Sequence, residues 1–311
     1  MNRLLKIEKP SRFVAVAESV LVTLIWASSF VLVKIGLDYM GPLTMAGLRY
    51  FLAFLLLLPF MTRNRNITRS MPSRLWIRLF FIGLSAYTIG NGALFWGLKY
   101  VPATTGSFLF SLIPLPILFA SVLWLKEIPT PLQLAGIVVS LVGSVLFFAP
   151  GFSAGESLGI GIVVVGLISF AGFAILGREV ARDRQVDTLS LTAIPLAFGG
   201  GILLLVAFPM EGLPRFPTMA WGIVLWLAVI NTAFAYMLYY HSLQVLTAVE
   251  MNVMLNLAPL VTAVLAWFLL SERLGMIQII GMITAIIGVV LVQWRRRGSN
   301  ADSSDSADAE P

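Results

Sequence analysis

Residues 114–127, PLPILFASVLWLKE, and residues 259–272, PLVTAVLAWFLLSE, stand in the same register of a repeat with an offset of 145 positions. Extended to 98–148 and 243–293, the alignment needs no gap and contains 12 identities in 51 pairs. The shared proline, glutamate and two glycines are informative, because chance matches in apolar sequence are mostly Leu or Val. These two copies stand at the ends of two halves of the chain, and each half contains five long apolar runs. Because five is odd, the second copy enters a membrane from the opposite side, which predicts an inverted-topology repeat.

The composition is that of a chain embedded in lipid. Hydrophobic residues make up 59% of the 311 positions and charged residues 12%, with a mean hydropathy of +0.92. These values lie far from those of soluble domains. Ten spans of about 20 residues each would use roughly 200 positions. We therefore expect an all-α membrane protein with ten transmembrane helices in two inverted five-helix repeats.

Several function classes are disfavoured by what the chain lacks. It has no cysteine, so it has no thiol nucleophile or thiolate metal site, and we expect no metal and no cofactor. No phosphate-binding loop with Lys-Ser/Thr occurs, so ATP is not the direct energy source. The Gly-x-Ser-x-Gly motif at 151–155 joins two spans rather than a strand and a helix, so we assign no catalytic residue and no enzyme activity.

The apolar runs place the spans and the domain boundaries. The first five spans are expected at 14–35, 43–61, 76–98, 103–125 and 131–149, and the second five at 158–178, 188–208, 219–240, 247–270 and 274–293. We divide the chain into an N-terminal segment (1–13), a first five-helix repeat (14–150), a second five-helix repeat (151–297) and a disordered acidic tail (298–311).

The distribution of Lys and Arg predicts the orientation. With the N-terminus inside, cytoplasmic segments contain 16 of the 21 basic residues and outer segments four. This asymmetry places both termini in the cytoplasm of a multi-pass protein of the plasma (bacterial inner) membrane. The net charge of +6 therefore reflects topology, and no nucleic-acid partner is expected.

Several motifs together carry a family resemblance. They are Trp26-Ala27-Ser28-Ser29-Phe30 followed by Lys34, then Leu48-Arg49-Tyr50, and the repeated proline and glutamate (Pro114 with Glu127, Pro259 with Glu272), each followed by a glycine (Gly136, Gly281). Over nearly its whole length the chain resembles the EamA type of the drug/metabolite transporter superfamily, whose best-described architecture is that of the YddG-like aromatic amino acid exporters. Departures from the family pattern are Ala27, Ser29 and Ile128-Pro129. The resemblance implies a central cavity between the repeats and export of amino acids, related metabolites or amphiphilic drugs.

Polar side chains recur at equivalent positions of the two copies. In each, a polar pair precedes the shared proline, Pro114 or Pro259, where the helix loses a hydrogen bond and bends. These faces either line a solute cavity or hydrogen-bond neighbouring helices, because unpaired polar groups are costly in lipid. The candidate substrate-binding residues, which include a tryptophan too deep to be an interfacial anchor, are Trp26, Tyr87, Asn91, Ser107, Ser111, Tyr236, Tyr240, Asn252 and Asn256.

Charged residues in or near the spans require an explanation, because inserting one at the centre of a membrane helix costs about 2.5–3.5 kcal/mol. Arg49 either attracts a substrate carboxylate, pairs with Glu272 or snorkels to the interface. Lys34 and Glu272 fall on the outer side, and Arg178 and Glu127 on the inner side, each pair from different repeats. They form either two cross-repeat ion pairs, made and broken alternately, or separate charges at headgroup level.

Two carboxylates lie about one turn inside the cytoplasmic ends of their helices. Glu18 and Glu250 either bind a coupling proton or reach the interface. His241 is the only histidine of the chain and sits at the inner end of the eighth expected span, where we assign it no catalytic role.

The sequence therefore predicts a secondary transporter that exports amino acids or related small amphiphiles by alternating access. Its partners are a small-molecule substrate and the lipid bilayer, and the oligomeric state stays open, with a monomer among the options. The alternatives are an intramembrane enzyme or lipid-handling protein that uses Glu18 or Glu250, and a receptor or scaffold that transports nothing.

Overall fold

The computed structural model describes residues 10–62, 71–97, 100–101, 103–151, 156–212, 217–258, 260–261, 264 and 275–294, and within these ranges it leaves some side chains, including those of Lys34 and Ser107, undescribed. Helix is the only regular secondary structure in these ranges. The expected N-terminal segment (except its last four residues), Pro259, Glu272 and the expected acidic tail lie outside the described residues.

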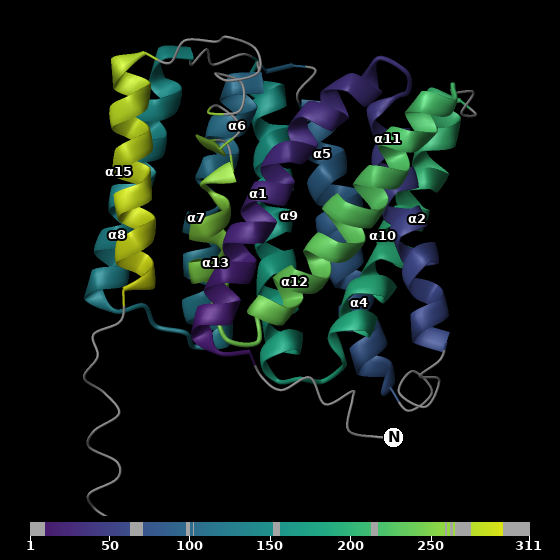
Figure 1. Ribbon diagram of the computed structural model, residues 1–311, viewed down its shortest axis with the longest axis horizontal. Coiled ribbons are helices and arrows are strands. Elements are labelled where there is room, and N and C mark those ends of the chain that lie inside the picture. Colours follow the sequence, from purple (N-terminus) through teal and green to yellow (C-terminus); the bar gives the residue numbers. More distant parts are fainter. Residues whose placement is uncertain are drawn as a thin grey trace, which may run out of the picture.

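The helices of the first half are arranged as five membrane-length units (Figure 1). They are α1 (Arg12–Leu37), α2 (Pro42–Thr62), a unit of α4 (Ser73–Gly83), the π-helical η1 (Leu84–Gly90) and α5 (Asn91–Gly97), a unit of α6 (Ala103–Ser111), α7 (Pro114–Ala120) and the π-helical η2 (Ser121–Leu125), and α8 (Pro131–Phe148).

After a short 3₁₀ turn, η3 (Ala149–Gly151), the second half follows the same order. It contains α9 (Ser157–Arg182), α10 (Thr188–Glu211), a unit of α11 (Thr218–Ala228), the π-helical η4 (Val229–Phe234) and α12 (Ala235–Ser242), then α13 (Ala248–Leu255) and α15 (Met276–Gln293). Nine helical units of the described chain are long and apolar enough to cross a membrane. They overlap nine of the ten expected spans, and the remaining span, 247–270, is described only in part.

The offset of 145 found in the sequence also relates the helices. Adding 145 to the bounds of α1, α4 and α8 gives the bounds of α9, α11 and α15. The π-helical segments obey the same rule, because η1 begins at Leu84 and η4 at Val229. The relation therefore extends to the first and third units of each half, where the sequence identity alone did not reveal it.

Glycines bring α8 and α15 into contact at the left edge of Figure 1, and the two helices are antiparallel. Gly136 faces Gly288, while Gly143 faces Gly281 and Ala285, so equivalent positions meet crosswise. A Cβ added at Gly143 would overlap the backbone of Ala285. Small residues allow such close approach of helices in lipid.

Three expected spans contain a π-helical segment, and two of these segments, η1 and η4, lie in spans that the sequence predicted as continuous helices. A π-helical turn shifts the hydrogen-bond register, and such turns often accompany functional sites. Here side chains supply further donors to backbone carbonyls of these turns: the Ser169 hydroxyl donates to Ser85 O at 2.9 Å, and Trp26 Nε1 donates to Asn231 O at 3.0 Å. A helix–helix hydrogen bond thus holds each of these two π segments to its neighbour.

The fourth unit is interrupted as its proline suggests. α6 ends at Ser111, two turn residues follow, and α7 begins at Pro114. Proline has no N–H to donate and fits the first turn of a helix. The break presents the carbonyl of Ser111 to the second half.

Candidate functional site

An aromatic cluster occupies the middle of the bundle. Tyr50 of α2 lies 4.6 Å from Tyr87 of η1, measured between ring centroids, and Tyr87 lies 5.3 Å from Tyr236 of α12. Tyr236 in turn lies 5.0 Å from Trp26 of α1. We use the name aromatic cluster for seven residues: Trp26, Tyr50, Tyr87, Phe173, Tyr236, Tyr239 and Tyr240.

The structure brings together four of the candidate residues in this cluster: Trp26, Tyr87, Tyr236 and Tyr240. It adds Tyr50, Phe173 and Tyr239, which the sequence analysis did not select. Phe173 stacks on Tyr239 with ring centroids 5.5 Å apart. The cluster is therefore larger than predicted and joins helices of both halves.

The π segment η4 positions one side of the cluster. Trp26 Nε1 donates to Asn231 O, and Asn231 Nδ2 donates back to Ile25 O at 2.6 Å. This reciprocal pair fixes the indole of Trp26 against α12. The register of α1 and the π turn are thus locked to each other beside the tyrosines.

Several buried polar atoms at the cluster lack a hydrogen bond of normal geometry, although the Tyr87 hydroxyl faces those of Tyr236 and Tyr240, and the Tyr239 hydroxyl faces the Asn252 side chain. Buried polar groups are nearly always bonded, so each exception needs an explanation. A solute with donors and acceptors of its own would provide partners. Within the described residues these atoms are the hydroxyl oxygens of Tyr87, Tyr239 and Tyr240, Thr232 Oγ1, Asn231 Oδ1 and Arg49 Nε.

Arg49 lies beside the cluster. Its Cζ is 4.8 Å from the ring centroid of Tyr50, a cation–π distance. None of the carboxylates in the described part of the chain forms an ion pair with it, while Glu272, its alternative partner, lies outside those residues. A guanidinium in this position can bind a carboxylate.

The amide candidates use their donors on backbone carbonyls. Asn256 Nδ2 donates to Ser111 O at 2.7 Å, which joins equivalent positions of the two halves. Asn91 Nδ2 donates to Ala86 O and Asn252 Nδ2 to Ala248 O, both near their own positions along the chain. In this conformation Asn256 therefore serves as a link between helices, the alternative that the sequence left open. The Ser111 hydroxyl donates to Phe108 O.

Charged residues gather at the end of the bundle where α1 begins and α9 ends, the lower end in Figure 1. We call this the inner end, after its expected orientation. The structure places Arg178 Nε 2.8 Å from Glu127 Oε1. Arg178 also donates to Leu243 O, and the Ser121 hydroxyl lies 3.4 Å from Glu127 Oε2. The inner-side pair proposed from the sequence is thus in contact.

Glu250 is enclosed by protein. It does not reach the interface, which was one of the two positions expected from the sequence. It is 3% exposed, and its carboxylate lies 2.7 Å from Arg12 Nη2. Gln133 Nε2 and the backbone N–H of Thr247 donate to the same carboxylate at 3.0 and 2.9 Å. A buried carboxylate needs such partners, because an isolated buried charge is very costly.

Glu18 meets the histidine to which no role was assigned. His241 Nδ1 lies 2.8 and 3.0 Å from the two carboxylate oxygens of Glu18, and the Ser242 hydroxyl donates to Oε2 at 3.1 Å. The sequence analysis did place both residues near the inner ends of their helices. Their shared depth was the signal that would have suggested a pair.

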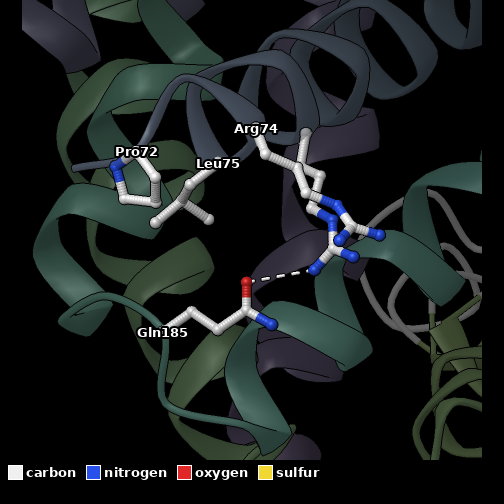
Figure 2. Close-up of a pocket in the computed structure, with 5 residues that line it drawn as sticks. Pro72, Arg74, Leu75 and Gln185 are labelled. Carbon is white, nitrogen blue, oxygen red and sulfur yellow. Dashed lines mark hydrogen bonds between the residues drawn. The ribbon is translucent and has the colours of Figure 1, made fainter.

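A pocket of about 440 Å³ opens at the inner end, away from the predicted residues (Figure 2). It is lined by Pro72, Arg74, Leu75, Arg78 and Gln185. Arg78 donates to Gln185 Oε1 at 3.1 Å and pairs with Glu179 at 3.1 Å.

Comparison with known proteins assigns the family. The model of the EamA-like transporter family matches residues 15–149 and again residues 157–294. The chain belongs to this family. The two matches cover most of the chain and divide it close to the boundary expected between the repeats. Family membership makes the chain a multi-pass membrane transporter.

Curated relatives agree with this assignment. An uncharacterized transporter of Archaeoglobus fulgidus is 31% identical over 87% of this chain and 94% of its own length. A probable terminal-alkyne amino-acid exporter of Streptantibioticus cattleyicolor is 26% identical over 93% of this chain and 97% of its own length. The uncharacterized inner membrane transporter YedA of Escherichia coli K12 is 24% identical over 86% of this chain and 87% of its own length.

A solved crystal structure shares the fold. It matches with a TM-score of 0.77 at 17% identity, and covers 91% of this chain and 98% of its own. This similarity concerns the arrangement of helices alone.

Proposed function

We propose that this transporter is a secondary carrier that exports amino acids or related small amphiphilic metabolites. It works by alternating access of two inverted five-helix halves, with both termini in the cytoplasm. One relative is named a probable amino-acid exporter, which supports the substrate class. The crosswise contact of α8 with α15 supports the inverted relation of the halves.

The aromatic cluster with Arg49 beside it is the observation that carries this proposal. The solute carboxylate binds the guanidinium of Arg49, and its apolar part lies between the rings of the cluster. The tyrosine hydroxyls that make no well-formed hydrogen bond then bond the ammonium group. An amino acid has all three features, whereas a purely apolar solute would leave these buried groups unpaired.

Cross-half contacts at the inner end support the transport cycle. Arg12 with Glu250, Glu18 with His241 and Glu127 with Arg178 each join helices of different halves. Together these contacts close the inner end in this conformation. Export requires them to separate, so that solute enters from the cytoplasm and reaches the rings. The expected outer pair, Lys34 with Glu272, closes the opposite end in turn.

Counterflow in proteoliposomes tests the function. Purified protein is reconstituted with unlabelled amino acids inside, and uptake of labelled amino acids of different side-chain classes is measured. We expect exchange of at least one class with no chemical change to the label. Absence of exchange for every class, or recovery of a modified product, contradicts the proposal.

Arg49 provides the matching variant. Arg49→Gln removes the charge and is expected to lower exchange at least about tenfold, since a charge-assisted hydrogen bond contributes about 1.5–3 kcal/mol. Arg74→Gln makes the same change at an exposed arginine and is expected to leave exchange within about twofold of wild type. Equal loss in both variants argues against carboxylate binding by Arg49.

A further inference from the structure

The contact between Glu18 and His241 joins the two halves at the inner end through an acid and a base. Glu18 belongs to α1, and His241 is near the end of α12. Their side chains are 16% and 19% exposed, so both are largely withdrawn from water. His241 Nε2 is buried and has no hydrogen-bond partner in the described part of the chain. The imidazole therefore has one partner, the carboxylate.

The offset of 145 shows that the repeat does not require this pair. It relates the contact of α1 with α12 to that of α9 with α5. Val163 then stands in place of Glu18 and Trp96 in place of His241. Val163 packs on Gly97 in an apolar contact. The same helix contact is thus apolar at one end and titratable at the other.

The surrounding charged groups are engaged elsewhere. On α1 itself and on α13, Arg12 and Glu250 bind each other. On α9, Arg178 and Arg182 bind Glu127, and Glu179 binds Arg78. Before α10, Asp187 caps the helix through Ser190. The other titratable groups on elements packed against α1 or α12 are Lys34, Arg49, Glu211, Tyr50, Tyr236, Tyr239 and Tyr240, and α11 and η4 contain no charged residue.

We propose that Glu18 and His241 form a proton-binding site that is occupied when the inner end is closed and releases its proton when that end opens. The inference rests on the proposed transport cycle. In the closed state the protonated imidazole and the carboxylate form an ion pair across the halves. When the halves separate, the ion pair is lost, the imidazole gives its proton to cytoplasmic water and returns to the neutral form.

Linkage gives the direction of the effect. If closing the inner end favours proton binding, proton binding favours closing by the same factor. Histidine is the side chain suited to such a change between pH 5 and 8. Raising the pH on the inner side removes the ion pair, weakens the contact between α1 and α12, and makes opening easier. Lowering the pH closes the inner end.

The first experiment uses the fact that the chain has one histidine. Protein carrying ¹⁵N-histidine and no histidine tag gives nitrogen signals from His241 alone. At a pH where the imidazole is neutral, we expect the proton on Nδ1 in wild type, because Glu18 accepts it. Glu18→Leu should move the proton to Nε2, and the control Glu156→Leu, at an exposed carboxylate, should not. The same tautomer in wild type and Glu18→Leu overturns the site.

The second experiment measures opening without any substrate. The chain has no cysteine, so Ser19→Cys, buried beside Glu18, reports access at the inner end, and the exposed Ser73→Cys corrects for the reactivity of the thiol. The corrected labelling rate with a membrane-impermeant maleimide should rise at least about threefold from pH 5.5 to 8. In His241→Gln it should be the same at both pH values. A rise that persists in His241→Gln overturns the linkage.

A third experiment measures the pH dependence of solute exchange. Exchange by wild type should increase over the same pH range, and His241→Gln should remove the dependence while exchange itself persists. A pH profile that is unchanged in His241→Gln counts against the inference and leaves the carrier function standing. If no solute is exchanged, the carrier function fails, and the tautomer and labelling measurements still decide the proton site.

Discussion

Single residues decide which polar groups are free for a solute. The sequence search relied mainly on residues whose counterparts 145 positions away are also polar, and in this way it found Tyr87 and Tyr236. It missed Tyr50 and Tyr239, whose counterparts are Pro195 and Leu94. Spacing on one helix also cannot show whether an amide is used on a backbone carbonyl, as in Asn256. These contacts depend on which neighbour each helix meets.

At the residue scale, the ion pair of Glu127 and Arg178 is expected to stabilise the observed conformation. Glu127→Gln leaves a nearly buried guanidinium without its counter-charge. Breaking such a pair costs roughly 3 kcal/mol, so we expect a clearly lower melting temperature in detergent. The double variant Glu127→Arg, Arg178→Glu should recover part of the loss. No difference between Glu127→Gln and wild type contradicts a role in closing the inner end.

Elements are the scale at which the sequence was most informative. Apolar runs predicted the helices to within a few residues, because lipid requires every span to satisfy its own backbone. The π segments η1, η2 and η4 were not predicted. η1 and η4 accept hydrogen bonds from side chains of neighbouring helices, such as that of Ser169 to Ser85 O, and no local sequence pattern encodes that neighbour.

The contact of α8 with α15 leads to a prediction for glycine. Gly143→Ala places a methyl group against the backbone of Ala285, so the helices must separate and the melting temperature should fall. The control is Gly161→Ala in α9, where an added Cβ meets nothing within 4 Å. There alanine should be neutral or stabilising by up to about 1 kcal/mol, since it is the better helix former. A similar response at both positions would refute the close contact.

A second element-scale prediction concerns the start of α2. The Glu211 carboxylate of α10 accepts hydrogen bonds from Leu43 N at 3.0 Å and Thr44 N at 2.8 Å. It thus caps the positive end of another helix. Glu211→Ala is expected to destabilise the protein by about 1–2 kcal/mol, measured by thermal unfolding in detergent. Glu211→Gln keeps a hydrogen-bond acceptor but has no charge, so its melting temperature should lie between those of wild type and Glu211→Ala.

On the scale of the whole molecule, the two ends of the bundle differ in chemistry although their helices are related by one offset. The inner end joins the halves through ion pairs, among them Glu18 with His241, whereas Val163, the counterpart of Glu18, packs on Gly97, the counterpart of Ser242. A carrier needs its two ends to open at different times. Different chemistry at equivalent contacts allows each end to respond to its own compartment.

Topology is the whole-molecule prediction that tests the inverted arrangement. Ten spans place both termini in the cytoplasm. Fusion of a cytoplasm-active fluorescent reporter to the N-terminus and, in a separate fusion, to the C-terminus should give signal in both cases. A reporter in the loop 151–156 should instead be active only as a periplasmic reporter. Opposite locations for the two termini contradict the inverted repeat.

The sequence by itself determined the helical membrane class, the positions of nine described spans and the family, because lipid imposes length and apolarity on each span and the family motifs are local. It also supplied the pair of Glu127 with Arg178 as a hypothesis, from the repeat and the expected sides of the membrane. Only the tertiary structure decided that Tyr50 and Tyr239 complete the aromatic cluster, that Glu250 is enclosed by Arg12 and Gln133, and that His241 meets Glu18. Such contacts depend on the rotation of each helix about its axis, which is set by the packing of side chains from distant parts of the chain.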